Sequence, residues 1–265
     1  MQFLAPKSQC AAERPPDPAD EKWAQFADHV ARYAFAMDYA KGRTVLDAGA
    51  GLGYGAAMLR AGGAARVVAV DIDPNVIAEA QSRYGDGGIE FLADDCQSLT
   101  KAVGPFDLIC SFENIEHLPQ PEQFLKAAAS RLAPNGLLII STPDRAATEP
   151  FVNGRPVNPY HFHEWYRDEF MELLGRYFSR CELRVQVKSN ALERRTQAAE
   201  ALVRHLKRNP LARLTGIAKF ALRRRSYWAP IRDLATPSPT DCPIVDPAVA
   251  IFFGRPWCHV VLCRV

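Results

Sequence analysis

The chain has 265 residues, of which 48% are hydrophobic and 23% are charged. These proportions exclude a wholly disordered chain, a collagen and a small disulfide-rich scaffold. The net charge of +2 does not by itself indicate a nucleic-acid or membrane partner. The seven cysteines include no C-x-x-C pair, so we expect reduced thiols in a cytoplasmic protein rather than a zinc site. No apolar run approaches the ~20 residues that span a bilayer, and the N-terminal residues lack the features of a signal peptide.

The N-terminal part of the chain predicts a linker followed by a helix. Residues 11–19 are rich in proline and charge, so we interpret residues 1–19 as the linker. Asp20 can then cap a helix whose apolar residues recur at helical spacing as far as about residue 40. This apolar side comprises Trp23, Phe26, Val30, Tyr33 and Met37. Such a stripe packs on a core.

From residue 43 the chain alternates short apolar runs with helical stretches. The expected strands are Thr44–Leu46, Val67–Val70, Ile89–Leu92, Asp107–Cys110, Leu137–Ser141, Glu182–Val187 and Cys258–Cys263. The expected helices begin near Tyr54, Pro74 and Pro121, and a further helix covers residues 164–178. This alternation predicts an α/β fold with a doubly wound, mostly parallel seven-stranded sheet, which binds ligands at the carboxyl ends of its strands.

The expected domain organisation is one core with an insertion. Residues 20–190 form the core, and residues 248–265 add a C-terminal strand that completes its sheet. Residues 191–247 form a basic helical insertion and a loop. The polar connection over residues 143–163 is long enough to be functional or disordered.

Residues 192–225 carry ten Lys or Arg residues and only two Glu residues. Asn209-Pro210 divides this segment into two expected helices. A solvated charged face is the simplest interpretation of this segment. The functional interpretation is contact with an anionic membrane, which is typical of a basic amphipathic helix. A nucleic acid stacked on Tyr227 and Trp228 is the less favoured one.

A glycine-rich turn follows the first expected strand, at residues 47–53, with the sequence D-A-G-A-G-L-G. Closely spaced glycines let the backbone turn sharply and approach a ligand beside the start of a helix. The spacing differs from the G-x-G-x-x-G of dinucleotide folds, and Asp47 stands two residues before the first glycine. A carboxylate there would repel a pyrophosphate. It suits a positively charged ligand, such as the amino group and sulfonium of S-adenosylmethionine.

Acidic residues also end the next two expected strands. Asp71 ends the second strand, where an acid can accept both hydroxyls of a ribose. Asp94 and Asp95 end the third, where an acid can accept a hydrogen bond from an adenine amine. Asp is a common cap and turn residue, so each signal alone is weak. Together with the glycine turn they predict a nucleoside site.

On these motifs, residues 12–190 resemble the class I S-adenosylmethionine-dependent methyltransferases of types 11 and 23. The resemblance implies that the glycine turn lines the methionine moiety, that Asp71 holds the ribose and that Asp95 with Cys96 flanks the adenine. The cofactor-binding residues that it implies are Asp47, Gly49, Gly51, Gly53, Asp71, Ile72, Asp95, Cys96 and Glu113.

Within that superfamily the chain is most similar to bacterial methyltransferases found with surface-polysaccharide genes. The matching stretches are His29-x-x-Arg32-Tyr33-x-Phe35-Ala36, Gly53-Tyr54-Gly55, Ser111-Phe112-Glu113-x-x-Glu116-His117-Leu118 and Asn158-Pro159-Tyr160-His161. Leu52 stands where these proteins often carry an acid, and Asp94 where a glycine is usual. The resemblance implies a glycan or small-molecule acceptor.

The fourth expected strand is followed by E-N-I-E-H at residues 113–117. If a helical turn follows, Glu113, Glu116 and His117 share one face, and such a set suits Mg²⁺ or Mn²⁺. The spacing resembles that of ubiquinone-pathway O-methyltransferases and of small-RNA 3′-end 2′-O-methyltransferases. In the RNA group a further histidine precedes a Glu-Trp pair, and His161 fits that position. The predicted metal ligands are therefore Glu113, Glu116, His117 and His161.

We predict Glu116, His117 and His161 as the catalytic residues. A bound cation can chelate two vicinal oxygens and lower the pKa of the one that attacks. Two alternatives stay open for His117, namely a metal-free general base and a purely structural group. Tyr160, Trp165 and Tyr166 offer aromatic faces to an acceptor, or pack as part of the core.

The predicted reaction is methyl transfer from S-adenosylmethionine to a sugar hydroxyl of a glycan, glycolipid or glycosylated metabolite. The runner-up acceptors are a quinone or phenol, and then an RNA ribose. A non-catalytic S-adenosylmethionine-binding sensor or scaffold would keep the strand-end acids without needing the histidines. We expect a cytoplasmic protein that can lie at the inner face of the membrane.

Overall fold

The computed structural model describes residues 27–148, 156–189, 244–248 and 254–265. The predictions for the linker, for the helix start at Asp20 and for the basic helices fall outside these residues. Within the described part of the chain, no helix combines the length and the apolar character needed to cross a membrane.

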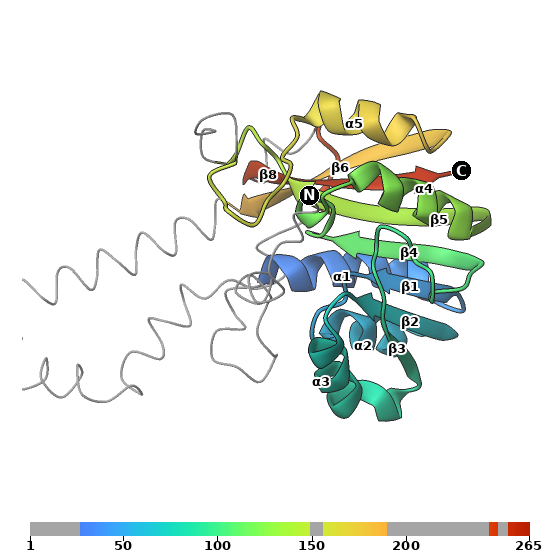
Figure 1. Ribbon diagram of the computed structural model, residues 1–265. Helices are drawn as coiled ribbons and strands as arrows, with labels where there is room; N and C mark the ends of the chain where they lie inside the picture. Colours follow the sequence, from blue (N-terminus) through green and yellow to red (C-terminus); the bar gives the residue numbers. More distant parts are fainter. Residues whose placement is uncertain (1–26, 149–155, 190–243, 249–253) are drawn as a thin grey trace, which may run out of the picture.

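The described strands form one sheet in the order β3-β2-β1-β4-β5-β8-β6-β7. Their bounds are β1 Thr44–Ala48, β2 Arg66–Asp71, β3 Ile89–Ala93, β4 Phe106–Phe112, β5 Leu132–Pro143, β6 Arg180–Ser189, β7 Ile244–Val245 and β8 Gly254–Arg264. Neighbours among β1 to β5 pair in parallel, whereas β8 pairs antiparallel with both β5 and β6. The predicted α/β class with a doubly wound, mostly parallel sheet is confirmed, and Figure 1 shows the strands in this order.

The described sheet has eight strands rather than the seven expected. The additional strand is β7, in a stretch that the sequence indicated as a loop. Ile244 and Val245 pair antiparallel with Gln186 and Val185 of β6. A strand of two residues has no periodicity of its own, so only the pairing with β6 defines it.

Helices cover both faces of the sheet. Their bounds are α1 Ala27–Ala40, α2 Tyr54–Ala61, α3 Pro74–Tyr84, α4 Pro121–Arg131 and α5 Arg167–Gly175. Two short 3-10 turns are η3 Gly85–Gly87 and η4 Ile115–His117. α1, α2 and α3 bury apolar side chains in one core cluster, and α4 and α5 in the other. The carboxyl ends of β1, β2 and β4 thus lie between two packed layers.

α1 contacts α2 mainly through small residues and one tyrosine. The ring of Tyr33 lies against Gly55, where a Cβ atom would stand only 2.0 Å from that ring. Val30 and Met37, from the predicted apolar side, are only partly buried, whereas Arg32 is completely buried. The inward face of α1 is therefore rotated from the predicted stripe, because the close approach to α2 favours small side chains.

The predicted helix over residues 164–178 is shorter, since α5 spans Arg167–Gly175. The residues before it are extended, because Trp165 forms a parallel β-bridge with Asp144 and its carbonyl accepts the N–H of Arg145 at 3.1 Å. This bridge joins the two ends of the connection that follows β5.

Candidate functional site

The glycine turn after β1 lies at the edge of the sheet where β2 ends. Gly49, Gly51 and Gly53 have φ angles of 85°, 53° and 84°, which residues with side chains rarely adopt. The N–H groups of Gly49 and Ala50 both donate to the carbonyl of Val70, at 2.9 and 2.8 Å. No atom of the described residues lies within 4 Å of the place that a Cβ of Gly51 would take. The backbone of Gly51 therefore leaves room for a ligand.

Asp47, the acid before the glycines, is completely buried. Tyr33 donates its hydroxyl to Asp47 Oδ1 at 2.9 Å, whereas Asp47 Oδ2 has no hydrogen-bond partner among the residues that the structure describes. Burial raises the pKa of Asp47 to about 7, with the charge of Asp71 adding to the rise and the Tyr33 hydrogen bond opposing it. A cation beside Oδ2 would restore the charged form of the carboxylate. Asp47 is therefore suited to a positively charged ligand group.

Asp71 joins the end of β2 to the glycine turn. Its Oδ2 accepts the N–H of Gly51 at 3.1 Å, and its Oδ1 accepts the N–H of Asp73 at 3.0 Å. Asp73 caps α3 through Asn75. The next residue, Ile72, is 46% exposed, which is unusual for a large apolar side chain at a strand end. Asp71 thus offers a carboxylate and Ile72 an apolar surface at the same edge.

The two acids after β3 have different surroundings. Asp94 accepts hydrogen bonds from the N–H groups of Asp95, Lys101 and Ala102 and from the hydroxyl of Thr100. Burial raises the pKa of Asp94, but these hydrogen bonds outweigh it and hold the pKa below its ordinary value. Asp94, which replaces the usual glycine, therefore organises the loop after β3.

Asp95 and Cys96, the residues predicted to flank an adenine, follow directly. Asp95 is partly buried, and its Oδ1 accepts the N–H of Gln97 at 2.8 Å. Cys96 is buried, with only 5% of its surface exposed. The Asp95 carboxylate is thus oriented by its own turn.

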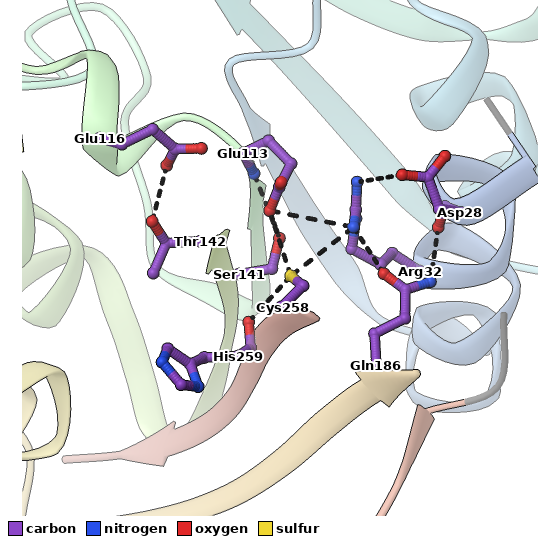
Figure 2. Close-up of polar contacts among 9 residues, drawn as sticks. All are labelled: Asp28, Arg32, Glu113, Glu116, Ser141, Thr142, Gln186, Cys258 and His259. Carbon is purple, nitrogen blue, oxygen red and sulfur yellow. Dashed lines mark hydrogen bonds and ion pairs between the residues drawn. The ribbon is translucent and has the colours of Figure 1, made fainter. Parts of the chain in front are cut away.

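Figure 2 shows a buried polar cluster, centred on Arg32 of α1, that the sequence reasoning missed. Arg32 Nη1 donates to Gln186 Oε1 at 2.6 Å and lies 3.9 Å from Glu113 Oε1. Burial lowers the pKa of Arg32, but the charges of Glu113, Cys258 and Asp28 outweigh it and raise the pKa above its ordinary value. Within the described part of the chain, Arg32 Nε has no hydrogen-bond partner. A charged, buried guanidinium with an unsatisfied N–H suits an anionic ligand group.

Glu113 belongs to this cluster and lies outside the group of potential metal ligands, contrary to the sequence prediction. The expected helical turn does not include Glu113, which has a φ of 49°, because only Ile115–His117 form the 3-10 turn η4. Glu113 Oε1 instead accepts the hydroxyl of Ser141 at 2.8 Å. The left-handed backbone at Glu113 separates its carboxylate from Glu116 and His117.

Glu116, His117 and His161 come together, with one potential ligand atom of each within 4.8 Å of the others. Glu116 is completely buried. Its Oε2 accepts the hydroxyl of Thr142 at 3.1 Å, and no described residue hydrogen-bonds its Oε1. Burial raises the pKa of Glu116 well above its ordinary value, and the charge of Glu113 adds to the rise.

Hydrogen bonds hold the two histidine-bearing segments together. The carbonyl of Glu116 accepts the N–H of Phe162 at 2.8 Å. His117 Nδ1 lies 3.0 Å from the carbonyl oxygen of Tyr160, so this nitrogen carries a proton and Nε2 carries the lone pair. The rings of His117 and His161 meet edge to face, with centroids 4.9 Å apart. The long connection, which the sequence predicted to be functional or disordered, thus returns to η4.

Of the aromatic residues proposed to face an acceptor, Trp165 belongs to the core. Its ring stacks on His163 with centroids 5.4 Å apart and lies 5.6 Å from Phe170. Tyr160 is partly buried, and Tyr166 is exposed. Trp165 therefore has the packing role that was the alternative in the sequence analysis.

Comparison with known proteins identifies relatives. A sequence profile described as a methyltransferase domain matches residues 19–196. A probable S-adenosylmethionine-dependent methyltransferase of Mycobacterium tuberculosis (strain H37Rv) is 36% identical over 151 residues, covering 56% of this chain and 53% of that protein. A ubiquinone biosynthesis O-methyltransferase of Coxiella burnetii is 35% identical over 107 residues, covering 40% of this chain and 45% of that protein. The chain spans about half the length of the curated relatives it matches.

Solved structures share the fold. The cyclase SpnF aligns over 97% of this chain and 91% of its own, with a TM-score of 0.58 and 17% identity. The phosphoethanolamine N-methyltransferase 2 of Haemonchus contortus aligns over 88% of this chain and 52% of its own, with a TM-score of 0.55 and 16% identity. These likenesses establish a Rossmann-like methyltransferase fold. Because the matched profile covers more than half of the residues, the chain belongs to the family of methyltransferase domains.

Proposed function

We propose that the chain transfers a methyl group from S-adenosylmethionine to a hydroxyl oxygen. The observation that carries this proposal is the completely buried Asp47 carboxylate, whose Oδ2 lacks a partner. An unsatisfied buried carboxylate oxygen is costly, and the amino group of the methionine moiety would satisfy it. The unsatisfied Nε of Arg32 suits the carboxylate of the same moiety.

The other residues around the glycine turn fit the adenosyl part of S-adenosylmethionine. Asp71 stands where a strand-end acid accepts ribose hydroxyls, and the exposed Ile72 offers an apolar face to the adenine. The open backbone of Gly51 lets a ligand approach closely. When bound, S-adenosylmethionine would supply a methyl group activated by its sulfonium.

On the acceptor side, His117 is the residue that we propose to take the proton of the attacking hydroxyl. Its Nδ1 donates to the carbonyl of Tyr160, so Nε2 is the basic atom. Holding the acceptor oxygen in line with the methyl group supplies up to ~7–11 kcal/mol of the barrier reduction. The segment containing Tyr160 therefore both fixes the imidazole and borders the acceptor.

A divalent cation is the alternative to this proton transfer, because the Nε2 lone pair of His117 can ligate a cation or take the proton, but not both. The donor set of Glu116, His117 and His161 fits a cation, because ligand atoms of all three lie within 4.8 Å of one another. Two imidazoles and one carboxylate suit Mn²⁺ better than Mg²⁺, which prefers oxygen ligands. Held there, a cation would lower the pKa of an acceptor hydroxyl.

The acceptor that we propose is a sugar hydroxyl of a glycan, glycolipid or glycosylated metabolite. Vicinal sugar oxygens match chelation by a cation at Glu116, His117 and His161. A lipid-linked glycan would also match the basic segment 192–225, whose membrane contact stays a prediction from the sequence. A quinol or phenol is the second candidate, favoured by the likeness to ubiquinone biosynthesis O-methyltransferases.

The first expected result concerns the acceptor class. Incubating the protein with a cell extract and methyl-labelled S-adenosylmethionine should label the polysaccharide or lipid fraction, and EDTA should remove that label. Label that persists in excess EDTA, with bound metal shown to be absent, would refute the cation. Label in quinones or RNA would replace the glycan acceptor. No label despite demonstrated cofactor binding would indicate a non-catalytic sensor or scaffold, since fold alone does not establish turnover.

The second expected result is that Asp71→Ala weakens binding of S-adenosylmethionine by roughly 10–100-fold, because hydrogen bonds to a charged group contribute ~1.5–3 kcal/mol. Isothermal titration calorimetry with S-adenosylmethionine and S-adenosylhomocysteine measures the change. Asp86→Ala, which removes an exposed carboxylate in η3, is the matched control. Equal dissociation constants for wild type and Asp71→Ala would contradict the ribose assignment.

A further inference from the structure

Glu164 is a buried carboxylate in the connection that follows β5. Its hydrogen bonds link the start of this connection, at Thr148, to its end, at His161. Its side chain is 3% exposed, and its Oε1 lies 2.8 Å from His161 Nδ1. Its other oxygen, Oε2, accepts the hydroxyl of Thr148 at 2.8 Å. Carboxylates are rarely buried without partners, and both oxygens of this one are paired.

The contacts of His161 are compatible with one neutral tautomer of its imidazole. Asn158 Oδ1 accepts the N–H of Tyr160 at 3.0 Å, which orients the amide so that Nδ2 faces His161 Nε2 at 3.0 Å. The amide therefore donates to a lone pair on Nε2. The proton must then be on Nδ1, where it is donated to the carboxylate of Glu164.

The surrounding backbone fixes the position of Glu164. The parallel bridge between Asp144 and Trp165 places the residue beside the turn that follows β5. Within that turn, the N–H of Thr148 donates to the carbonyl of Asp144 at 3.2 Å. The turn that contains Thr148 is thus attached to the sheet, and the Thr148 hydroxyl donates a hydrogen bond to Glu164. One carboxylate oxygen of Glu164 is therefore fixed by Thr148, and the other accepts the N–H of His161.

We propose that Glu164 is the positioning residue of the acceptor site, which fixes the orientation and the Nδ1–H tautomer of His161. This inference rests on the proposed function, in which His161 belongs to the cation-binding set of the acceptor site. A carboxylate that accepts the Nδ1–H of a ligand-binding histidine fixes the ring orientation and directs the Nε2 lone pair at the ligand. His161 can then use Nε2 only when the Asn158 amide gives way, and the hydrogen bond to Glu164 still fixes the ring when it does.

Proton NMR of the ligand-free protein and steady-state kinetics test this role. In the wild type, the buried Nδ1–H of His161 should give a downfield imidazole resonance, assigned by its loss in His161→Asn. Glu164→Leu should remove the resonance and lower kcat about 10–100-fold, the range found for such supporting partners. Binding of S-adenosylmethionine should be unchanged. Glu164→Gln, which keeps an acceptor oxygen without the charge, should retain a resonance shifted upfield and part of the activity.

Glu172→Leu, which removes an exposed carboxylate paired with Arg176 on α5, is the matched control and should change neither readout. A purely structural role would lower the melting temperature of Glu164→Leu and leave the resonance and kcat as in the wild type, which would overturn the proposal. If the leucine variant does not fold, an unshifted resonance in Glu164→Gln would overturn it equally. Because the resonance is read without substrate, failure of the proposed methyl transfer remains distinguishable.

Discussion

Replacing Asp47 with asparagine is expected to stabilise the ligand-free protein at pH 8 and to abolish its binding of S-adenosylmethionine. The Asp47 carboxylate is completely buried, and one of its oxygens has no partner. Asparagine keeps an acceptor oxygen for the Tyr33 hydroxyl but carries no charge. The substitution therefore removes the buried charge and with it the attraction for the amino group of the ligand.

The sign of the pH dependence of folding stability follows from the direction in which the pKa of Asp47 is shifted. The pKa of Asp47 is raised, from its ordinary value near 3.8, to about 7 in the folded protein. The folded state therefore binds a proton more tightly than the unfolded state. The resulting stability is fully present below the unfolded pKa and is lost as the pH rises through about 7. S-adenosylmethionine, which pairs with the ionised form, should bind more tightly over the same rise.

Thermal denaturation and calorimetry measure both effects. At pH 8 we expect Asp47→Asn to be more stable than the wild type by on the order of 2–4 kcal/mol, since each unit of pKa shift is worth ~1.4 kcal/mol. At pH 5 the difference should be less than half as large, and it should vanish only below the unfolded pKa near 3.8. Asp38→Asn, at an exposed position of α1, changes the charge equally and should alter neither property. Equal melting temperatures at both pH values, or unchanged affinity for S-adenosylmethionine, would refute the role of Asp47.

The strand-end acids show how much of the site is predictable from the sequence. The end of a buried strand is visible where an apolar run stops, and parallel strands present these ends at one edge of a sheet. The positions of Asp47 and Asp71 at that edge follow from this rule. The rule does not tell which of Asp94 and Asp95 is available to a ligand. Four hydrogen bonds from the following residues give Asp94 its structural role, and these bonds cannot be predicted from the strand pattern.

The cluster around Arg32 marks the limit of that reasoning. Arginine is ordinarily exposed, and two partners of Arg32, Gln186 and Cys258, are 154 and 226 positions away in the chain. Only the three-dimensional pairing of β6 with β8 brings them to α1. The one sequence signal for Arg32 was its place in the stretch His29-x-x-Arg32-Tyr33, which matches the similar bacterial methyltransferases. The placement of Glu113 was not predictable either, because it depends on a left-handed backbone angle at a residue other than glycine.

His117→Ala is expected to lower kcat by about 10²–10⁴-fold, the range of general acid–base catalysis, while S-adenosylmethionine still binds with wild-type affinity. The reason is the position of the imidazole. Its Nδ1 is fixed by the carbonyl of Tyr160, and its ring meets that of His161. Single-turnover methyl transfer and calorimetric titration separate the two quantities. His163→Ala, which alters a neighbouring histidine stacked on Trp165, is the control.

The same variant also distinguishes the two mechanisms that the geometry of His117 permits. If the imidazole ligates a cation together with Glu116 and His161, excess Mn²⁺ should restore part of the activity of His117→Ala, because two of the three ligands remain. If the imidazole accepts the acceptor's proton without a metal, added imidazole should restore activity, and Mn²⁺ and EDTA should have no effect. A wild-type rate in His117→Ala would exclude both, and the proton would then have to leave through His161 or solvent.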